Sequence, residues 1–271
     1  MSEDAGAGAT GPMQWLPARG EQRGWCLAKL REVAGGPPRF APPERPRAMQ
    51  IALELPKVFD DRPGRSLILA AAARAVARFC LDARVAPGGE WNEAYTAWVG
   101  SQMRKVARRA RGSHWTATET LAGVEAREGE AAARVFVPGP LDAVDPLIQR
   151  LQVGGTDAPT DTPQGRADVP SAVILLVDGE LEMSAGKAAA QAGHAIMLLL
   201  AALDEERVSR WIDDGMPIDA RRADREDWAG AKAAVDAGRP GYAGVRDAGY
   251  TEVAPGSLTV IGVDPETAKG V

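Results

Sequence analysis

The sequence contains few of the residues that build disulfide frameworks or metal centres. Its two cysteines are Cys26 and Cys80, and its two histidines are His114 and His194. Two isolated cysteines form no disulfide framework and no metal-binding pattern, and reduced thiols suit the cytosol. We therefore expect a cytoplasmic protein with no zinc site.

Long apolar runs and an excess of positive charge are also missing. The longest apolar stretch, around residues 195–203, is far shorter than the ~20 residues that a transmembrane helix needs. The first twelve residues have neither the basic start nor the apolar core of a signal peptide, so none is expected. A formal net charge of −5 creates no global positive field for nucleic acid. The remaining composition, 45% apolar and 25% charged, is typical of a soluble globular protein.

The stretch Met183–Leu200 is the most distinctive part of the chain. It follows the apolar run 172–177, a predicted buried strand, and its alanine-rich, proline-free composition predicts a helix. Lys187, Gln191 and His194 are spaced by four and three residues, which places them on one face of that helix. Such a row at a strand–loop–helix corner indicates a ligand site. The plainer alternative is a solvated lysine and a packed histidine.

A nucleotide phosphate loop does not explain this corner. Six residues separate Gly179 from Gly186, where that motif requires four. Ala188 also stands where the motif needs a Ser or Thr to hold magnesium. We reject this interpretation.

Repeated spacings indicate an internal duplication. The pattern A-R-R-A, then four other residues, then Trp occurs at 107–115 and again at 220–228, an offset of 113. The same offset relates Trp98 to Trp211. Because tryptophan is rare, we predict two copies of one module. Gly64-Arg65 matches Gly186-Lys187 at an offset of 122, and the longer loop 85–93 absorbs the difference.

The predicted organisation has four parts. Residues 1–46 form an arm that packs loosely, with one short helix at 19–33; residues 47–153 form the first module, 154–170 a flexible linker, and 171–271 the second module. The predicted fold class is α/β, with two tandem three-layer α/β/α modules, each a small mixed sheet flanked by helices, forming an intramolecular pseudo-dimer. Predicted strands are 49–55, 172–177, 252–253 and 258–263, and predicted helices are 64–81, 186–203 and 225–237. Pro217 predicts an edge or shortened strand after Trp211.

Two blocks of sequence resemble the type 2 peptidyl-tRNA hydrolases. Residues 186–195, G-K-A-A-A-Q-A-G-H-A, are similar to the helix signature of that family, and residues 247–260, D-A-G-Y-T-E-V-A-P-G-S-L-T-V, are similar to its second signature. The resemblance covers about the last hundred residues. It implies hydrolysis of the ester between a peptide and the terminal ribose of tRNA, without a metal or an organic cofactor. Family members act as homodimers, so the duplication implies a monomer with an internal pseudo-dimer, a homodimer being the alternative.

The chemistry of ester hydrolysis suggests a role for each candidate residue. Asp247 would activate or orient the water, and Lys187 would stabilise the oxyanion or bind the terminal phosphate at a helix N-terminus. Gln191, Thr251 and Thr259 would orient substrate or water through hydrogen bonds, whereas His194 would pack and hydrogen bond in the interior. The sequence departs from the family at Ala185 and Tyr250, where basic residues are usual.

The first module lacks the same polar groups. At an offset of 122, Leu69 matches Gln191 and Ala72 matches His194. If Gly139 matches Gly249, Val137 stands opposite Asp247 and Leu141 opposite Thr251. We therefore predict a catalytically silent first copy.

Basic residues of the first module supply a candidate tRNA surface. From residue 171 on, acidic residues exceed basic ones by about seven, which disfavours phosphate binding by the second module alone. The predicted tRNA-binding residues are Arg104, Lys105, Arg108, Arg109 and Arg111, joined by Arg221, Arg222 and Arg225. A solvated charged face is the alternative for this run. For the whole chain, the alternatives to a peptidyl-tRNA esterase are a non-catalytic RNA-binding or regulatory protein, and a hydrolase of another small ester or amide.

Overall fold

The computed structural model describes residues 13–34, 45–160, 171–249 and 252–269. The first half contains α1 (Glu21–Ala34), β1 (Arg47–Glu54), α2 (Arg65–Cys80), α3 (Asn92–Val99), β2 (Arg104–Ala110), α4 (Gly112–Ala117), β3 (Gly123–Glu128), β4 (Ala131–Phe136), β5 (Gly139–Pro140) and α5 (Pro146–Gln149), with short 3₁₀ turns η1 (Ala83–Val85), η2 (Thr118–Thr120) and η3 (Leu141–Ala143). The second half contains β6 (Val173–Val177), α6 (Ala185–Ala202), α7 (Glu205–Asp213), β7 (Ile218–Arg222), α8 (Arg225–Asp236), β8 (Tyr242–Arg246), β9 (Leu258–Val263) and α9 (Pro265–Lys269).

The two halves build sheets of the same topology. The first sheet has the order β2-β1-β4-β3, with β5 also paired to β1, and the second has the order β7-β6-β9-β8. In each sheet the first pair is parallel and the other two pairs are antiparallel. These are the two small mixed α/β sheets that the sequence predicts.

Local geometry repeats at the sequence offset of 113. The indole N–H of Trp98 donates to the carbonyl of Arg104 at 3.0 Å, and that of Trp211 donates to the carbonyl of Pro217 at 2.9 Å. Met103 and Met216, also 113 residues apart, both have positive φ, at 46° and 59°. Non-glycine residues seldom adopt this conformation, so a shared tight turn before the second strand of each sheet is a specific likeness. That the halves are copies of one module stays a prediction.

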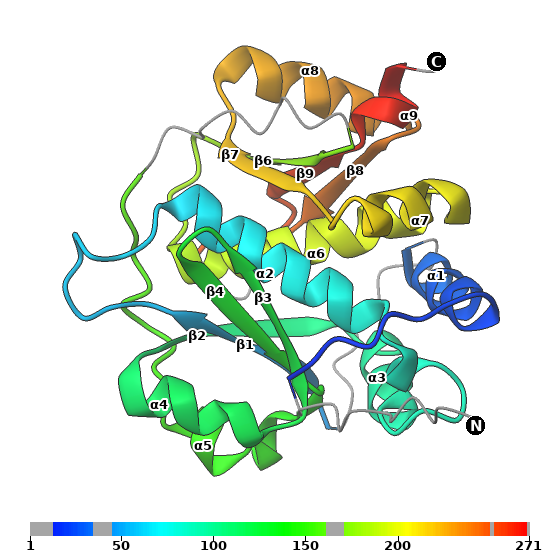
Figure 1. The fold of residues 1–271 in the computed structure, drawn as a ribbon. Helices are drawn as coiled ribbons and strands as arrows, with labels where there is room; N and C mark the ends of the chain where they lie inside the picture. The colour runs from blue at the N-terminus through cyan, green and yellow to red at the C-terminus, as the bar shows by residue number, and fades with distance from the viewer. Residues whose placement is uncertain (1–12, 35–44, 161–170, 250–251, 270–271) are drawn as a thin grey trace, which may run out of the picture.

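Helices α2 and α6 lie side by side between the two sheets (Figure 1). One central hydrophobic core runs through both halves, from Ile51 and Val76 to Leu175 and Ala189. A Cβ at Gly193 would lie 2.8 Å from Cγ2 of Val76, so glycine permits the close approach of α6 to α2. The two halves therefore share one interior.

The outer faces of the sheets have cores of their own. Because strand side chains alternate between faces, Ala52 of β1 packs outward against Trp115 of α4, and Leu176 of β6 packs outward against Trp228 of α8. Figure 1 shows α4 and α5 below the first sheet and α8 above the second. The central helices are thus enclosed on both sides.

Most predicted elements are confirmed to within two residues. They are strands 49–55, 172–177 and 258–263 and helices 19–33, 64–81, 186–203 and 225–237. Pro217 precedes the five-residue strand β7, which lies at the edge of its sheet as predicted. The predicted strand at 252–253 is wrong, because these residues lie in the loop between β8 and β9.

The predicted flexible linker and loose arm are corrected in part. The backbone N–H of Arg65 donates to the carbonyl of Pro159 at 2.9 Å, and Thr156 and Ala158 are buried, so part of the segment 154–160 is anchored to the body. Helix α1 buries Cys26 and Leu27 in the central core, so this part of the arm does not pack loosely. Residues 1–12, 35–44 and 161–170 lie outside the described residues. No helix in the described ranges is both long and apolar enough to cross a membrane.

Candidate functional site

Asp247 is the centre of a polar cluster at the start of the loop between β8 and β9. Its Oδ2 accepts hydrogen bonds from Lys187 Nζ and Gln191 Nε2, and its Oδ1 accepts one from the backbone N–H of Gly249 at 2.7 Å. Asp247 and Gln191 are each 8% exposed. Two of the three polar residues in the helix row therefore meet the carboxylate of the second signature, 60 residues from Lys187.

Short backbone contacts hold this loop in shape. The N–H of Asp247 donates to the carbonyl of Ser257 at 2.9 Å, and the N–H of Gly256 donates to the carbonyl of Asp247 at 2.7 Å. Gly249 has a φ of +79°, and a Cβ there would lie 2.3 Å from Cγ of Pro255. Any larger residue would be strained and would clash. The D-A-G and P-G parts of the second signature thus fit together as one turn.

Ser184 caps the helix that carries Lys187. Its Oγ accepts from the N–H of Lys187 at 3.1 Å, which satisfies one free donor of the first turn. The N–H and Oγ of Ser184 donate to the Glu252 carboxylate at 2.7 and 2.8 Å. Glu252 therefore ties the second signature to the start of α6.

The polar cluster opens onto a cavity of about 460 Å³. One side of the cavity consists of Lys187, Gln191 and His194 from α6 with Asp247 and Glu252 from the loop. The other side is residues 102–107, the turn and strand β2 of the first half. The cavity is therefore formed by both halves of the chain.

His194 lines this cavity as a neutral side chain. Burial, and secondarily the charge of Lys105, lowers the pKa of its imidazole well below the ordinary value. Desolvation disfavours the charged form of a histidine, and a nearby cation adds to that effect. His194 thus carries no charge near pH 7, and its predicted packing role stays a prediction.

Thr259, one of the two candidate threonines, does not join the described cluster. Thr259 is fully buried in β9, and its hydroxyl donates to the carbonyl of Val245 at 3.2 Å. It does not line the cavity, so its predicted contact with substrate or water is not supported by its position. Thr251 lies outside the described residues, as does Tyr250.

The predicted basic surface is divided. In β2, Arg104 and Arg108 point to the opposite face from Lys105 and Arg109, because strand side chains alternate. Arg108 donates to Gln50 Oε1 at 2.8 Å and to the carbonyl of Leu151 at 3.0 Å. Arg222 donates to the carbonyl of Gly179, Arg221 lies 3.7 Å from Asp219, and exposed Arg225 lies 3.7 Å from Glu180. Arg108, Arg221, Arg222 and Arg225 therefore already have protein partners in the two halves.

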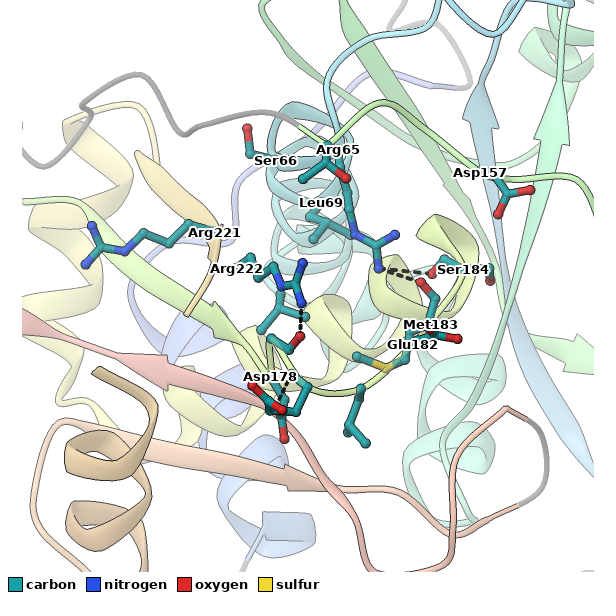
Figure 2. Close-up of a pocket in the computed structure, with 15 residues that line it drawn as sticks. Arg65, Ser66, Leu69, Asp157, Asp178, Glu182, Met183, Ser184, Arg221 and Arg222 are labelled. Atoms are coloured by element: carbon teal, nitrogen blue, oxygen red, sulfur yellow. Dashed lines mark hydrogen bonds between the residues drawn. The ribbon is translucent and has the colours of Figure 1, made fainter. Parts of the chain in front are cut away.

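A second cavity, of about 530 Å³, lies where α2 begins (Figure 2). Arg65 and Leu69, which match Lys187 and Gln191 in the repeat, both line it. Arg65 donates from Nη2 to the carbonyls of Met183 at 2.7 Å and Ser184 at 3.5 Å. Arg65 of the first half therefore holds the segment that caps α6.

The proposed alignment of Gly139 with Gly249 is wrong. Strand pairing matches the hairpin turn after Glu128 in the first half with the loop that begins at Asp247. Val137 and Leu141 are therefore not the counterparts of Asp247 and Thr251. Glu128, which ends β3 just before that turn, is buried and lies 2.5 Å from the Arg74 guanidinium, so this acid is held in an ion pair. The first half lacks the long signature loop altogether.

Sequence reasoning missed Glu252, Thr156 and the inward direction of Lys105. Glu252 was inside a predicted strand, and Thr156 inside a predicted flexible linker, where its Oγ1 accepts from the N–H of Gly186 at 3.0 Å. The alternation within β2 was the available signal for Lys105. Across the described ranges, no three His, Cys, Asp or Glu residues cluster so as to hold a metal ion.

The fold and cluster define an α/β protein whose site combines a carboxylate, an ammonium and an amide at a strand–loop–helix corner. The family model described as "Peptidyl-tRNA hydrolase PTH2" matches residues 171–271. A peptidyl-tRNA hydrolase of Methanopyrus kandleri is 35% identical over 102 residues, which cover 36% of this chain and 87% of that protein. The peptidyl-tRNA hydrolase of Pyrobaculum aerophilum is 37% identical over 100 residues, 34% of this chain and 82% of that protein. Human mitochondrial peptidyl-tRNA hydrolase 2 is 32% identical over 100 residues, 35% of this chain and 56% of that protein.

The chain belongs to the peptidyl-tRNA hydrolase PTH2 family. Lys187, Gln191, His194 and Asp247 all lie within the matched segment. The strand β2 that forms the other side of their cavity lies before it.

Proposed function

We propose that this protein hydrolyses the ester bond of peptidyl-tRNA and releases a peptide and free tRNA. One observation carries the proposal: Asp247, Lys187 and Gln191, all within the segment that matches the family, are joined by hydrogen bonds at the edge of a cavity.

In the proposed mechanism Asp247 orients and activates a water molecule. Water attacks the ester carbonyl, the bond from carbonyl carbon to ribose oxygen breaks, and the ribose oxygen takes up a proton. Gln191 and the N–H of Gly249 fix the carboxylate by hydrogen bonds to its two oxygens. Positioning of this kind lowers the entropic part of the barrier.

Lys187 is the proposed group for the negative charge that develops on the carbonyl oxygen. It lies in the first turn of α6, where the positive end of the helix dipole adds to its own charge. Without substrate it pairs with Asp247, so the substrate must share or replace that contact. A pre-organised cation stabilises the transition state more than the neutral ester, which is the requirement for catalysis.

The proposed tRNA contacts are the basic residues of both halves. They are Arg104, Lys105, Arg108, Arg109, Arg111, Arg221 and Arg222. Charged contacts to phosphates would offset the acidic balance of the second half. Because these side chains lie on different faces, only some of them can reach one bound tRNA together.

An assay with N-blocked aminoacyl-tRNA tests the proposal. We expect Asp247→Asn and Lys187→Ala each to lower the release of free tRNA by roughly a hundredfold, the scale of losing one pre-organised polar group. Asp213→Asn, an exposed carboxylate at the end of α7, is the matched control and should keep wild-type rates. Wild-type rates in Asp247→Asn would contradict the assigned chemistry.

A non-catalytic RNA-binding protein is the second candidate. The direct pairing of Lys187 with Asp247 favours it, because each charge already has a partner. The same assay separates the two functions, since this candidate binds tRNA without releasing it from the peptide.

We further propose a cytosolic monomer that contains its own pseudo-dimer. Both cysteines are free and buried, which supports a reducing compartment. The shared core between α2 and α6 supports a pairing of the halves within one chain.

A further inference from the structure

The cavity around Asp247 has a wall that the matched family segment does not contain. Residues 102–107 of the first half form that wall and face α6 across the cavity. The first half therefore packs on α6 and also forms part of the site.

Lys105 is the residue of this wall that points toward α6. A Cβ at Gly193 of α6 would lie 3.6 Å from Cδ of Lys105, so the lysine stem crosses the helix where it has no side chain. The matching residue of the second half is Ile218, which is buried. An apolar residue thus suffices for packing at this position, and the first half has a cation instead.

The ammonium of Lys105 has weak partners. Its Nζ lies 3.3 Å from the carbonyl of Met103 and 5.3 Å from the centre of the Trp98 ring. Within the described ranges, no carboxylate lies at ion-pair distance from it. The other cations that line the cavity have partners: Lys187 pairs with Asp247, and Arg246 pairs with Asp236. The Arg104 guanidinium donates to Gln102 Oε1 at 3.0 and 2.7 Å. An ammonium surrounded by protein and lacking a counterion is energetically unfavourable, and an incoming anion would relieve that cost.

We propose that Lys105 is a substrate-binding residue that the first half supplies to the cavity, where its ammonium binds a phosphodiester of the 3′ end of the tRNA. This inference rests on the proposed function for the identity of the ligand. The first half has a short turn after Glu128 where the second half has the signature loop. The inference gives this half a role in substrate binding.

The charges around Lys105 support a pH dependence of this contact. Burial lowers the pKa of the Lys105 ammonium to about 7. The ionisable groups facing it are His194 from α6 and Cys80 from α2, with Tyr95 from α3 next to Cys80. Burial keeps His194 neutral and raises the pKa of Cys80 to about 12 and that of Tyr95 well above its ordinary value. Lys105 is thus the group of this set that changes charge between pH 6 and 8.5.

The test uses the full chain and an RNA hairpin whose single-stranded 3′ end carries an N-acetylated amino acid ester. We expect Lys105→Met to raise KM about tenfold at pH 6.2, the scale of one charge-assisted hydrogen bond, and to raise it much less at pH 8.5. The turnover number kcat should stay within about twofold of wild type. Lys105→Arg, which is charged throughout this range, should keep low KM at both pH values. Lys57→Met removes an exposed lysine of the same half that does not line the cavity, and it should change neither parameter.

Two further measurements keep the outcome decisive. An unchanged KM in Lys105→Met at pH 6.2, or a fall in kcat alone, would overturn the proposal. An equal KM effect on an N-acetylamino acid ester of a nucleoside without phosphate would also overturn it. If the wild type releases no product, the Kd of a hairpin with an uncleavable amide linkage tests Lys105 separately from hydrolysis. A Kd that Lys105→Met does not change at pH 6.2 would then count against the inference.

Discussion

At the scale of single residues, the site depends on how each charge is surrounded. The Asp247 carboxylate has an ammonium, a side-chain amide and a backbone N–H as partners, whereas the Lys105 ammonium has a carbonyl and an aromatic ring. The first arrangement is a satisfied cluster that holds its groups in place. The Lys105 ammonium can still bind an anionic ligand, and without one it lowers the stability of the folded protein.

The stability cost of Lys105 predicts a pH effect. From pH 7 to about 10 the unfolded chain keeps a proton on Lys105 that the folded protein has lost, because the folded pKa is about 7 and the ordinary value is 10.5. Raising the pH over this range therefore stabilises the fold through this group. We expect Lys105→Met to be more stable than wild type in urea at pH 7, with the difference shrinking toward pH 10.

The comparison between variants isolates this lysine. Burial raises the pKa of the Cys26 and Cys80 thiols to about 12, and these thiols act in the opposite direction only above their ordinary pKa of 9.0. Because the charge of Lys105 partly lowers the pKa of Cys80, the two proteins are best compared between pH 7 and 9, where both thiols keep their protons in the folded chain. Lys57→Met, at an exposed position, should show no such pH-dependent difference. Parallel stability curves for wild type and Lys105→Met would contradict the assignment of a buried amine.

At the scale of elements, the N-terminus of α6 is where the site is assembled. Ser184 caps α6 and hydrogen bonds to Glu252 of the signature loop. Thr156 accepts a hydrogen bond from Gly186 in the first turn of α6, and Arg65 donates one to Met183, just before the helix. Lys187 is placed by contacts from three separate segments. A change in the cap should therefore affect both stability and catalysis.

Replacing Ser184 by Ala tests this assembly. Loss of the cap should cost about 1 kcal/mol, which lowers Tm by roughly 2–4 °C in a protein of this size. We expect kcat to fall as well, because Glu252 loses one of its two bonds to residue 184. Thermal unfolding and hydrolysis rates measure the two effects, and Ser184→Thr, which keeps the hydroxyl, should restore most of both. A Tm and kcat equal to wild type in the alanine variant would show that the cap does not position the site.

At the scale of the whole molecule, the two sheets enclose α2 and α6 in one core (Figure 1). The face that each central helix presents beyond its own sheet is covered by the other half of the same chain. Strand β2 also packs on α6, and strand β7 packs on α2, so the cross-contacts are reciprocal. This arrangement leaves the pairing surfaces of both halves occupied.

We therefore predict a monomer in solution. Light scattering coupled to size-exclusion chromatography should give the chain mass of 28.5 kDa, unchanged over a dilution series. A mass of twice that value at all concentrations would show that another surface pairs the chains. The Arg65→Ala variant serves as a comparison, since it removes one contact between halves without exposing the shared core.

The sequence by itself was sufficient for whatever depends on neighbours along the chain. Helical spacing placed Lys187 and Gln191 on one face, the repeat at 113 residues anticipated matching topologies, and the signature blocks indicated the family. Tertiary structure decided what depends on pairing between distant segments. It matched the loop at Asp247 with the turn after Glu128 in place of Gly139, and it put Thr259 in the interior of β9 and Lys105 on the cavity wall. The physical reason is that strand register and helix packing determine which face of β2 meets α6. The periodicity of a segment shows which residues share a face, but it does not show which distant element packs against that face.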